Sequence, residues 1–283
     1  MNKQKKSSLA VTTHNKWLSN DGIFAGLLEY YAAYSKRQLH LNSKRIGQIK
    51  KLVRYPVKSM AGIEMDEALL GWHGLTGDRR FGVRKVDKAG DFPWLTAGRM
   101  PELLLYKSVE FDANLLPKKV QTPSGELLDI TSKELRAEIH RQSGHQVELM
   151  ALKHGIFDDA VISLIASATA AHVCSEAGVS ADSRRFRANI EISCDQPSPF
   201  AEDDWVGSVI SFGESANAPA VHITKRDIRC KMISLDPDTA EHSPIVLKTA
   251  VQLNDNNAGV YGTVIRTGTI KVGDALLLLN CAE

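Results

Sequence analysis

The cysteine at position 230 is surrounded by positive charge. Four of the seven residues from 225 to 231 are Lys or Arg, and Arg229 and Lys231 flank Cys230 directly. Nearby cations lower the pKa of a thiol, and the thiolate is the form that attacks as a nucleophile or binds a metal. The composition of this segment therefore predicts a reactive or metal-binding thiol at Cys230, with an inert cysteine as the alternative.

Three further cationic clusters fall on predicted turns or strand ends. They are Pro56-Val57-Lys58-Ser59, Gly77-Asp78-Arg79-Arg80-Phe81 and Ser183-Arg184-Arg185-Phe186-Arg187-Ala188-Asn189-Ile190. A Lys beside a Ser can bind an oxyanion, and an Arg can grip a phosphate with two parallel hydrogen bonds. Each cluster alone fits a solvated ion pair equally well. If the fold brings the clusters together, they predict a site for a phosphate-bearing ligand.

Several other functional classes lack their signatures. The sequence contains no glycine-rich nucleotide loop and no Gly-x-Ser-x-Gly elbow. The net charge is only +2, which gives no case for nucleic acid binding. The histidines show no metal-ligand spacing, although a nucleophilic pair of Cys230 with His222 or His242 stays open.

The four cysteines, at positions 174, 194, 230 and 281, include no Cys-x-x-Cys pair. This spacing favours a reducing compartment over a disulfide scaffold or a zinc site, so we expect a cytoplasmic protein. The basic start is followed by polar residues, which is unlike a secretory signal. Residues 22–34 are too short to span a membrane and predict a surface-packed helix capped by Asn20 or Asp21, with membrane or partner docking as the alternative.

Hydrophobic periodicity predicts mostly strands. Residues 46–55 alternate imperfectly before Pro56, and residues 81–86 and 103–109 are further short apolar runs between turns, typical of an antiparallel sheet or barrel. After a strand at residues 147–152, residues 161–177 have near-helical spacing, with Asp158 and Asp159 before them and Gly178 after. Later strands are predicted at residues 189–193, 209–212, 221–224, 231–235, 262–266 and 276–280. The residues alone therefore predict a β-rich pair of subdomains with a few helices.

Taken together and in order, these segments resemble the MOSC proteins, named for the C-terminal domain of molybdenum cofactor sulfurase. The likeness covers roughly residues 46–279 and is greatest to the group with an N-terminal MOSC β-barrel domain, which includes the mitochondrial amidoxime reducing component and its bacterial counterparts. The first matching set is Tyr55-Pro56-Val57-Lys58-Ser59-Met60, Gly62, Gly74-Leu75, Gly77-Asp78-Arg79 and Leu95-Thr96-Ala97. The second is Arg185-Phe186-Arg187, Asn189-Ile190, Arg229-Cys230, Asp236-Pro237-Asp238-Thr239, Val260-Tyr261-Gly262 and the Gly-rich residues 268–274.

The resemblance implies a β-rich α+β fold. It would consist of an N-terminal extension with a short helix (residues 1–44), a MOSC N-terminal β-barrel-like domain (45–150) and a MOSC β-barrel domain with a few flanking helices (151–283). It also implies a pterin molybdenum cofactor between the two domains, with Cys230 as the metal ligand and catalytic residue. The implied cofactor contacts are Lys58, Ser59, Arg79, Ser167, Arg187, Asn189, Arg229 and Tyr261. The family is also associated with pyridoxal phosphate binding, to which we assign no residue.

The function implied is reduction of small N-hydroxylated compounds. This chain departs from the family pattern at Asp227, where many relatives have a second cysteine, and at Ala188, where proline is usual. It also lacks the clustered cysteines of a [2Fe–2S] domain, so electrons would come from a separate protein such as a ferredoxin, a flavodoxin or a cytochrome b5-like carrier. Two alternatives stay open: sulfur transfer through a Cys230 persulfide, and non-catalytic carriage of the cofactor.

Overall fold

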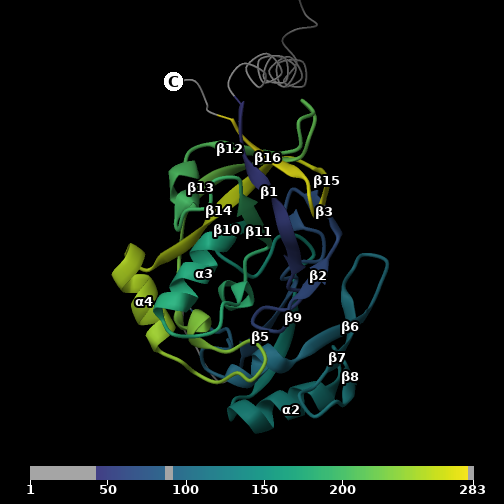
Figure 1. Ribbon diagram of the computed structural model, residues 1–283. Coiled ribbons are helices and arrows are strands. Elements are labelled where there is room, and N and C mark those ends of the chain that lie inside the picture. Colours follow the sequence, from purple (N-terminus) through teal and green to yellow (C-terminus); the bar gives the residue numbers. More distant parts are fainter. Residues whose placement is uncertain (1–42, 87–91, 280–283) are drawn as a thin grey trace, which may run out of the picture. The chain divides into compact units, whose positions relative to one another are not determined.

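The computed structural model describes residues 43–86 and 92–279, which fall almost entirely in one compact unit, Lys44–Cys281 (Figure 1). The helix predicted at residues 22–34, with its caps Asn20 and Asp21, lies outside the described residues, and so does Cys281. Across the part of the chain that the structure describes, no helix is both long and apolar enough to cross a membrane.

A closed seven-stranded barrel forms the larger core. Its strands run in the order β11-β10-β14-β13-β12-β16-β1, and β1 pairs back onto β11, so that no edge of the sheet is left open. The strands are β1 (Ser43–Arg54), β10 (Ile162–Ala166), β11 (Ile190–Cys194), β12 (Val209–Phe212), β13 (Ala220–Ile228), β14 (Asn257–Arg266) and β16 (Ala275–Leu279), with β2 (Ile63–Met65) attached to β1. Fully buried Ile49, Leu164, Ile192 and Ile223 lie in the interior.

The remaining strands form three small sheets. They are β3 (Glu67–Gly71), β4 (Gly74–Leu75) and β15 (Gly268–Lys271); β5 (Phe81–Lys85) and β9 (Val147–Ala151); and β6 (Lys107–Phe111), β7 (Pro117–Gln121) and β8 (Leu127–Asp129). A second core, which includes Val83, Leu103, Val120 and Leu135, packs the last two of these sheets against α2 (Lys133–Ser143), whereas β3, β4 and β15 contribute to the barrel core. Helices α3 (Ser167–Glu176) and α4 (Ile245–Asn254) pack on each other in a third cluster and lie side by side in Figure 1.

The barrel uses strands from both ends of the chain. β1 places Ile49 opposite Ile192 of β11, and the later strand β15 pairs with β3. The predicted β-rich fold with a barrel and a few helices is confirmed. The predicted domain boundary at residue 150 stays a prediction, but β1 belongs to the barrel core built mainly from residues after that point.

One predicted helix is half strand. Residues 161–177 split into β10 and α3, and all five residues of Ile162–Ala166 are buried between β11 and β14. A continuous apolar run fits a buried strand and a buried helix equally well, so periodicity could not separate them. Asp158 and Asp159 therefore precede a strand, and α3 begins only at Ser167.

Two predicted strands are partly or wholly wrong. Residues 103–109 begin in the 3-10 helix η1 (Pro101–Leu105), because Pro101 fixes the first turn and Leu103 and Leu104 are buried on one side of it. Residues 231–235 form the 3-10 helix η4 (Lys231–Ser234), closed by a bond from the Leu235 amide to the Met232 carbonyl. Two more 3-10 helices are η2 (Ser183–Phe186) and η3 (Ala201–Trp205).

Candidate functional site

The four cationic clusters meet at one cavity of about 530 Å3. The predicted site residues that line it are Lys58, Ser59, Arg79, Arg187, Arg229, Cys230 and Tyr261. They come from the turn after β1, the turn before β5, the end of η2, the β13–η4 junction and β14. Segments as far apart in the sequence as Lys58 and Tyr261 therefore contribute to a single surface, as the clusters predicted.

Cys230 is the exposed thiol among the three described cysteines, since Cys174 is buried and Cys194 is half-buried. It is the residue before η4, and the backbone next to it is fixed by Asn256. The Arg229 amide donates to the Asn256 carbonyl at 2.8 Å, and the Asn256 side-chain amide donates to the Arg229 carbonyl at 2.7 Å. These two hydrogen bonds fix the backbone next to Cys230, whose thiol lies at the cavity wall.

Arg79 connects most of the site. Its guanidinium pairs with buried Asp78 at 2.6 Å and with Asp158 at 2.7 Å, and it donates to the Asn189 side chain and the Arg187 carbonyl. Burial opposes the charge on Arg79, but Asp78 and Asp158 outweigh burial and raise the pKa of the guanidinium. Arg79 is therefore a fixed cation whose position is set by three segments of the chain.

Arg187 is a cation without such support. Its guanidinium lies over the Tyr55 ring, 4.2 Å from the ring centre, and among the described residues no carboxylate forms an ion pair with it. Its Nη2 atom is inaccessible to solvent and has no hydrogen-bond partner in the structure. Desolvation lowers the pKa of Arg187 to about 10, with Tyr55 opposing this effect. An anionic ligand would supply the partner that the protein does not.

Lys58 lies beside Asp158 at the same cavity. Its Nζ donates to the Phe157 carbonyl at 2.9 Å and lies 4.0 Å from an Asp158 oxygen. Burial lowers the pKa of Lys58, and Asp158 partly restores it. Burial acts to raise the pKa of Asp158, but Arg79 and Lys58 outweigh it and lower that pKa. The carboxylate thus holds two cations at the cavity wall.

Three of the cavity residues have left-handed backbone. Ser59, Arg79 and Arg187 have φ values of 70°, 41° and 53°. Non-glycine residues rarely adopt this conformation, and it is often kept at functional sites because it aims a side chain or an amide where a ligand needs it. The three strained positions belong to three different cationic clusters of the sequence.

Two predicted contacts, Asn189 and Ser167, lie outside the cavity lining. Asn189 is buried and accepts from Arg79 at 3.2 Å, while its amide donates to the Val53 carbonyl at 3.2 Å. It therefore positions Arg79. The Ser167 hydroxyl donates to a Glu191 oxygen at 2.6 Å, and neither residue lines the cavity.

The guanidinium of Arg229 is turned inward. It pairs with buried Asp227 and donates to the carbonyls of Phe186 and Ala258. Burial raises the pKa of Asp227 to about 6, against the opposing effect of Arg229. Of the two cations that flank Cys230, Lys231 is the exposed one. Arg229 consequently stabilises the loop, whereas Lys231 makes no ion pair with any described residue.

Sequence reasoning missed several lining residues. Asp158 was assigned to a helix start, and exposed Phe92 and Ile228 carried no signal beyond being apolar. Arg80, a candidate for phosphate, is instead bound to the carbonyls of Leu152 and Lys153. Neither His222 nor His242 is among the residues that line the cavity of Cys230.

The donor set fits a cofactor that brings its own metal ligands. Within residues 43–86 and 92–279, no group of three or more His, Cys, Asp or Glu side chains is arranged to hold a metal ion. The cavity instead offers one exposed thiol, several cations and two unpartnered guanidinium nitrogens, of Arg187 and Arg229. A metal held mainly by an anionic organic group, with one thiolate from the protein, is compatible with this arrangement.

Comparison with known proteins assigns the family. The model of the MOSC N-terminal β-barrel domain matches residues 46–185, and the model of the MOSC domain matches residues 151–277. The chain is a MOSC-domain protein. The two matches together span the described barrel and the Cys230 cavity, and MOSC domains are associated with molybdenum-cofactor enzymes.

Solved structures similar to this MOSC-domain protein are distant. The YuaD protein from Bacillus subtilis is 15% identical, with 85% of this chain and 100% of that chain covered and a TM-score of 0.45. YiiM from Geobacillus stearothermophilus is 18% identical, covers 43% of this chain and 55% of its own, and has a TM-score of 0.33. YiiM from Escherichia coli is 14% identical, at 46% and 59% coverage and a TM-score of 0.33. No curated protein matches the chain significantly.

Proposed function

We propose that this MOSC-domain protein is a molybdenum-cofactor-dependent reductase of small N-hydroxylated compounds. The observation that carries the proposal is the exposed thiol of Cys230 in a cavity whose charged lining consists of six cations and three carboxylates. When bound, the cofactor supplies a two-electron redox couple at the metal. Cys230 would be its protein ligand, and Lys58, Ser59, Arg79, Arg187 and Lys231 would hold its anionic groups, with Asn189 positioning Arg79.

The chain's own residues would bind and orient the cofactor and move protons. Conversion of an N–OH group to N–H and water takes up two electrons and two protons. The Asp227 carboxyl lines the cavity three residues before Cys230, and burial raises its pKa to about 6, so that it exchanges its proton closer to neutral pH than an ordinary aspartate does. The hydroxyl of Tyr261 lies at the same wall. These two groups are our candidates for proton delivery.

Electrons would arrive from a separate protein. The proposal requires a ferredoxin, a flavodoxin or a cytochrome b5-like donor, and places the protein in the cytoplasm. Such a donor would have to approach the cavity mouth, where Phe92, Ile228 and Lys231 are exposed. Weak electron-transfer encounters use small contact areas, so a rim of this kind is sufficient for docking.

Metal content and turnover test the proposal together. The full chain, produced in a host that makes the cofactor, should contain molybdenum and reduce benzamidoxime to benzamidine with a chemical electron donor. Cys230→Ala should lose turnover and release metal more readily, whereas Cys194→Ala, a half-buried thiol outside the cavity, should retain both. Absence of molybdenum in the wild type, or unchanged metal and turnover in Cys230→Ala, would contradict the proposal.

Sulfur transfer is the second candidate, because Cys230 is exposed beside the exposed cation Lys231. The Cys230 thiolate would attack the terminal sulfur of a desulfurase persulfide, form a new S–S bond and release the donor thiolate. Mass spectrometry after incubation with a desulfurase and cysteine should then find one added sulfur on Cys230. A cofactor carrier, the third possibility, would bind molybdopterin and release it quickly without turnover of any N-oxide or hydroxylamine.

A further inference from the structure

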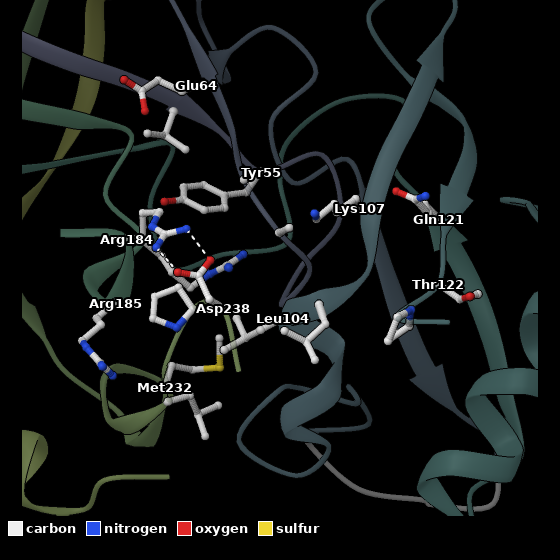
Figure 2. A pocket seen from close by; sticks show the side chains of 18 of the residues that line it. Tyr55, Glu64, Leu104, Lys107, Gln121, Thr122, Arg184, Arg185, Met232 and Asp238 are labelled. Atoms are coloured by element: carbon white, nitrogen blue, oxygen red, sulfur yellow. Dashed lines mark hydrogen bonds and ion pairs between the residues drawn. The ribbon is translucent and has the colours of Figure 1, made fainter. Parts of the chain in front are cut away.

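A second cavity, of about 620 Å3, shares Arg187 with the Cys230 cavity, and Figure 2 shows the side chains that line it. It is formed by the end of β1, η1, the β7–β8 turn, η2 and the segment that follows η4. Apart from Arg187 and Met232, none of its lining residues is shared with the Cys230 cavity. The volume is in the range of small-molecule binding sites. The proposed reductase activity assigns it no role.

Arg185 lines this cavity and is only partly paired. It is 5% exposed, and its Nη2 atom pairs with Asp236 at 2.7 Å. Its Nε and Nη1 atoms are buried without any hydrogen-bond partner. A guanidinium has five N–H donors, and burying such donors without hydrogen-bond acceptors costs free energy. Arg187, with its own unpartnered Nη2, lines the same cavity.

Arg184 and Asp238 form a clasp on the same wall. Arg184 donates to both Asp238 oxygens, at 2.8 Å and 2.5 Å, and also pairs with Asp182. Figure 2 shows the two side chains facing each other, with Lys107 and Gln121 on the wall across the cavity. Arg184 is therefore held by carboxylates that a stronger anionic ligand can displace.

The charge balance of the lining is positive. Four cations, Lys107, Arg184, Arg185 and Arg187, and two carboxylates, Glu64 and Asp238, line the cavity, while Asp182 and Asp236 pair with Arg184 and Arg185 from outside the lining. Glu64 also lies 3.8 Å from Lys51, which reduces its effect on a ligand. Lys107 is exposed and makes no ion pair among the described residues, so its charge is available at the mouth.

The rest of the wall is apolar. Leu104, Leu105, Met232 and Leu235 lie between the cationic groups, and the ring of Tyr55 closes one end under Arg187. A ligand that fits must combine an anionic group with an apolar body, because a small inorganic ion would leave this surface uncovered.

We propose that this second cavity binds a small organic anion, a carboxylate or phosphate ester on an apolar or aromatic body, and that the bound anion weakens cofactor binding through Arg187. The anionic group pairs with Arg187, Lys107 and Arg184, for which it competes with Asp238, and the body packs on Leu104 and Met232. Because Arg187 lines both cavities, two anions compete for one guanidinium. Thermodynamic linkage makes the effect reciprocal, so bound cofactor lowers the affinity for the organic anion by the same factor.

Calorimetric titration of the cofactor-free full chain with phenyl phosphate and phenylacetate tests the binding step. The titration uses the variant Lys58→Ala. This change weakens anion binding in the Cys230 cavity, and Lys58 does not line the second cavity. We expect one of the two probes to bind at least about tenfold more tightly than inorganic phosphate and than uncharged benzyl alcohol. This titration does not depend on the reductase proposal.

Three variants locate the site. Lys107→Glu should lower the affinity for the probe about tenfold. Lys118 is also exposed and lies on the neighbouring strand β7 outside the cavity lining, so Lys118→Glu should leave that affinity unchanged. Asp238→Asn should raise the affinity for the probe several-fold, because the substitution removes one of the two carboxylates that hold Arg184. None of these changes affects a buried core residue, so folding is retained.

Loading the wild-type chain with cofactor tests the coupling, with an expected weakening of the probe of about threefold or more. Failure of both probes to bind overturns the proposal, and so does binding that ignores Lys107→Glu and Asp238→Asn. Equal probe affinity with and without cofactor overturns the coupling. If the probe binds as described but no molybdenum is found, the reductase proposal fails and the anion site stands.

Discussion

The guanidinium of Arg187 lies over the ring of Tyr55, with 4.2 Å between its central carbon and the ring centre. Arg79 approaches the same ring at 4.9 Å. Two like charges therefore share one aromatic surface, but only Arg79 has carboxylate partners among the described residues. We therefore expect Arg187 to contribute more to ligand binding than to the stability of the ligand-free protein. Both contributions can be measured with variants.

We predict that Arg187→Met does not destabilise the cofactor-free protein. Methionine removes a poorly solvated cation and keeps most of the packing volume, so the free energy of unfolding should be equal or higher by about 1 kcal/mol, even though the contact with Tyr55 is lost. The same variant should retain cofactor at least about tenfold less tightly. Urea unfolding and equilibrium dialysis measure the two quantities. A clear loss of stability in the free protein would show that Arg187 is a structural residue.

Arg79→Met provides the opposite case. It leaves Asp78 fully buried without its ion pair and frees Asp158, although the Asp78 carboxylate still accepts from the Tyr55 amide at 2.7 Å. Removing one partner of a buried pair costs about 3–5 kcal/mol. Urea unfolding should therefore show a large loss for Arg79→Met and none for Arg187→Met, and equal effects of the two changes would contradict this account of the site.

The sequence located the chemistry better than it located the elements. Lys58, Arg79, Arg187 and Cys230 were each found from charge and local motifs, because solvated or ligand-binding cations are conspicuous in a short window. Their meeting at one cavity could not be derived, since it depends on β1 pairing with β11 more than 130 residues away. It became predictable only through the resemblance to a family.

The misassigned elements have a common cause. The buried strand β10 and the helix α3 follow each other without a turn residue, so one apolar run covers both. Similarly, η4 reads as a strand because Met232, Ile233 and Leu235 are apolar, although the chain turns there at Cys230. Local periodicity does not record which side of the chain is covered by a distant segment.

Gly74→Ala should destabilise the fold strongly. Gly74 has φ +86°, and a Cβ there would lie 1.9 Å from the Val161 carbonyl oxygen just before β10. The neighbouring Gly71 is the matched control, since the nearest heavy atom to its Cβ would be 3.8 Å away. We expect a loss of about 3 kcal/mol or more for Gly74→Ala and less than about 1 kcal/mol for Gly71→Ala by urea unfolding. Similar effects at both positions would show that the contact at Val161 is not rigid.

Glu202 predicts a pH dependence of stability that does not involve the functional site. Its side chain is fully buried, accepts from Thr169 at 2.7 Å and from the Ala166 amide at 3.3 Å, and burial raises its pKa from 4.5 to about 7. A carboxyl with a raised pKa in the folded state stabilises that state below pH 4.5, and this contribution is lost as the pH rises toward 7.

The variant Glu202→Gln isolates this contribution, because glutamine keeps the shape of the protonated carboxyl and does not titrate. The free energy of unfolding of the wild type minus that of the variant should fall between pH 4.5 and 7.5 by an amount on the order of 3 kcal/mol. Asp204→Asn, an exposed carboxylate in the same 3-10 helix, should leave the pH profile of the wild type unchanged. Urea unfolding at several pH values measures all three proteins. A constant difference between wild type and Glu202→Gln would mean that Glu202 stays ionised in the folded protein, compensated by its hydrogen bonds to Thr169 and Ala166.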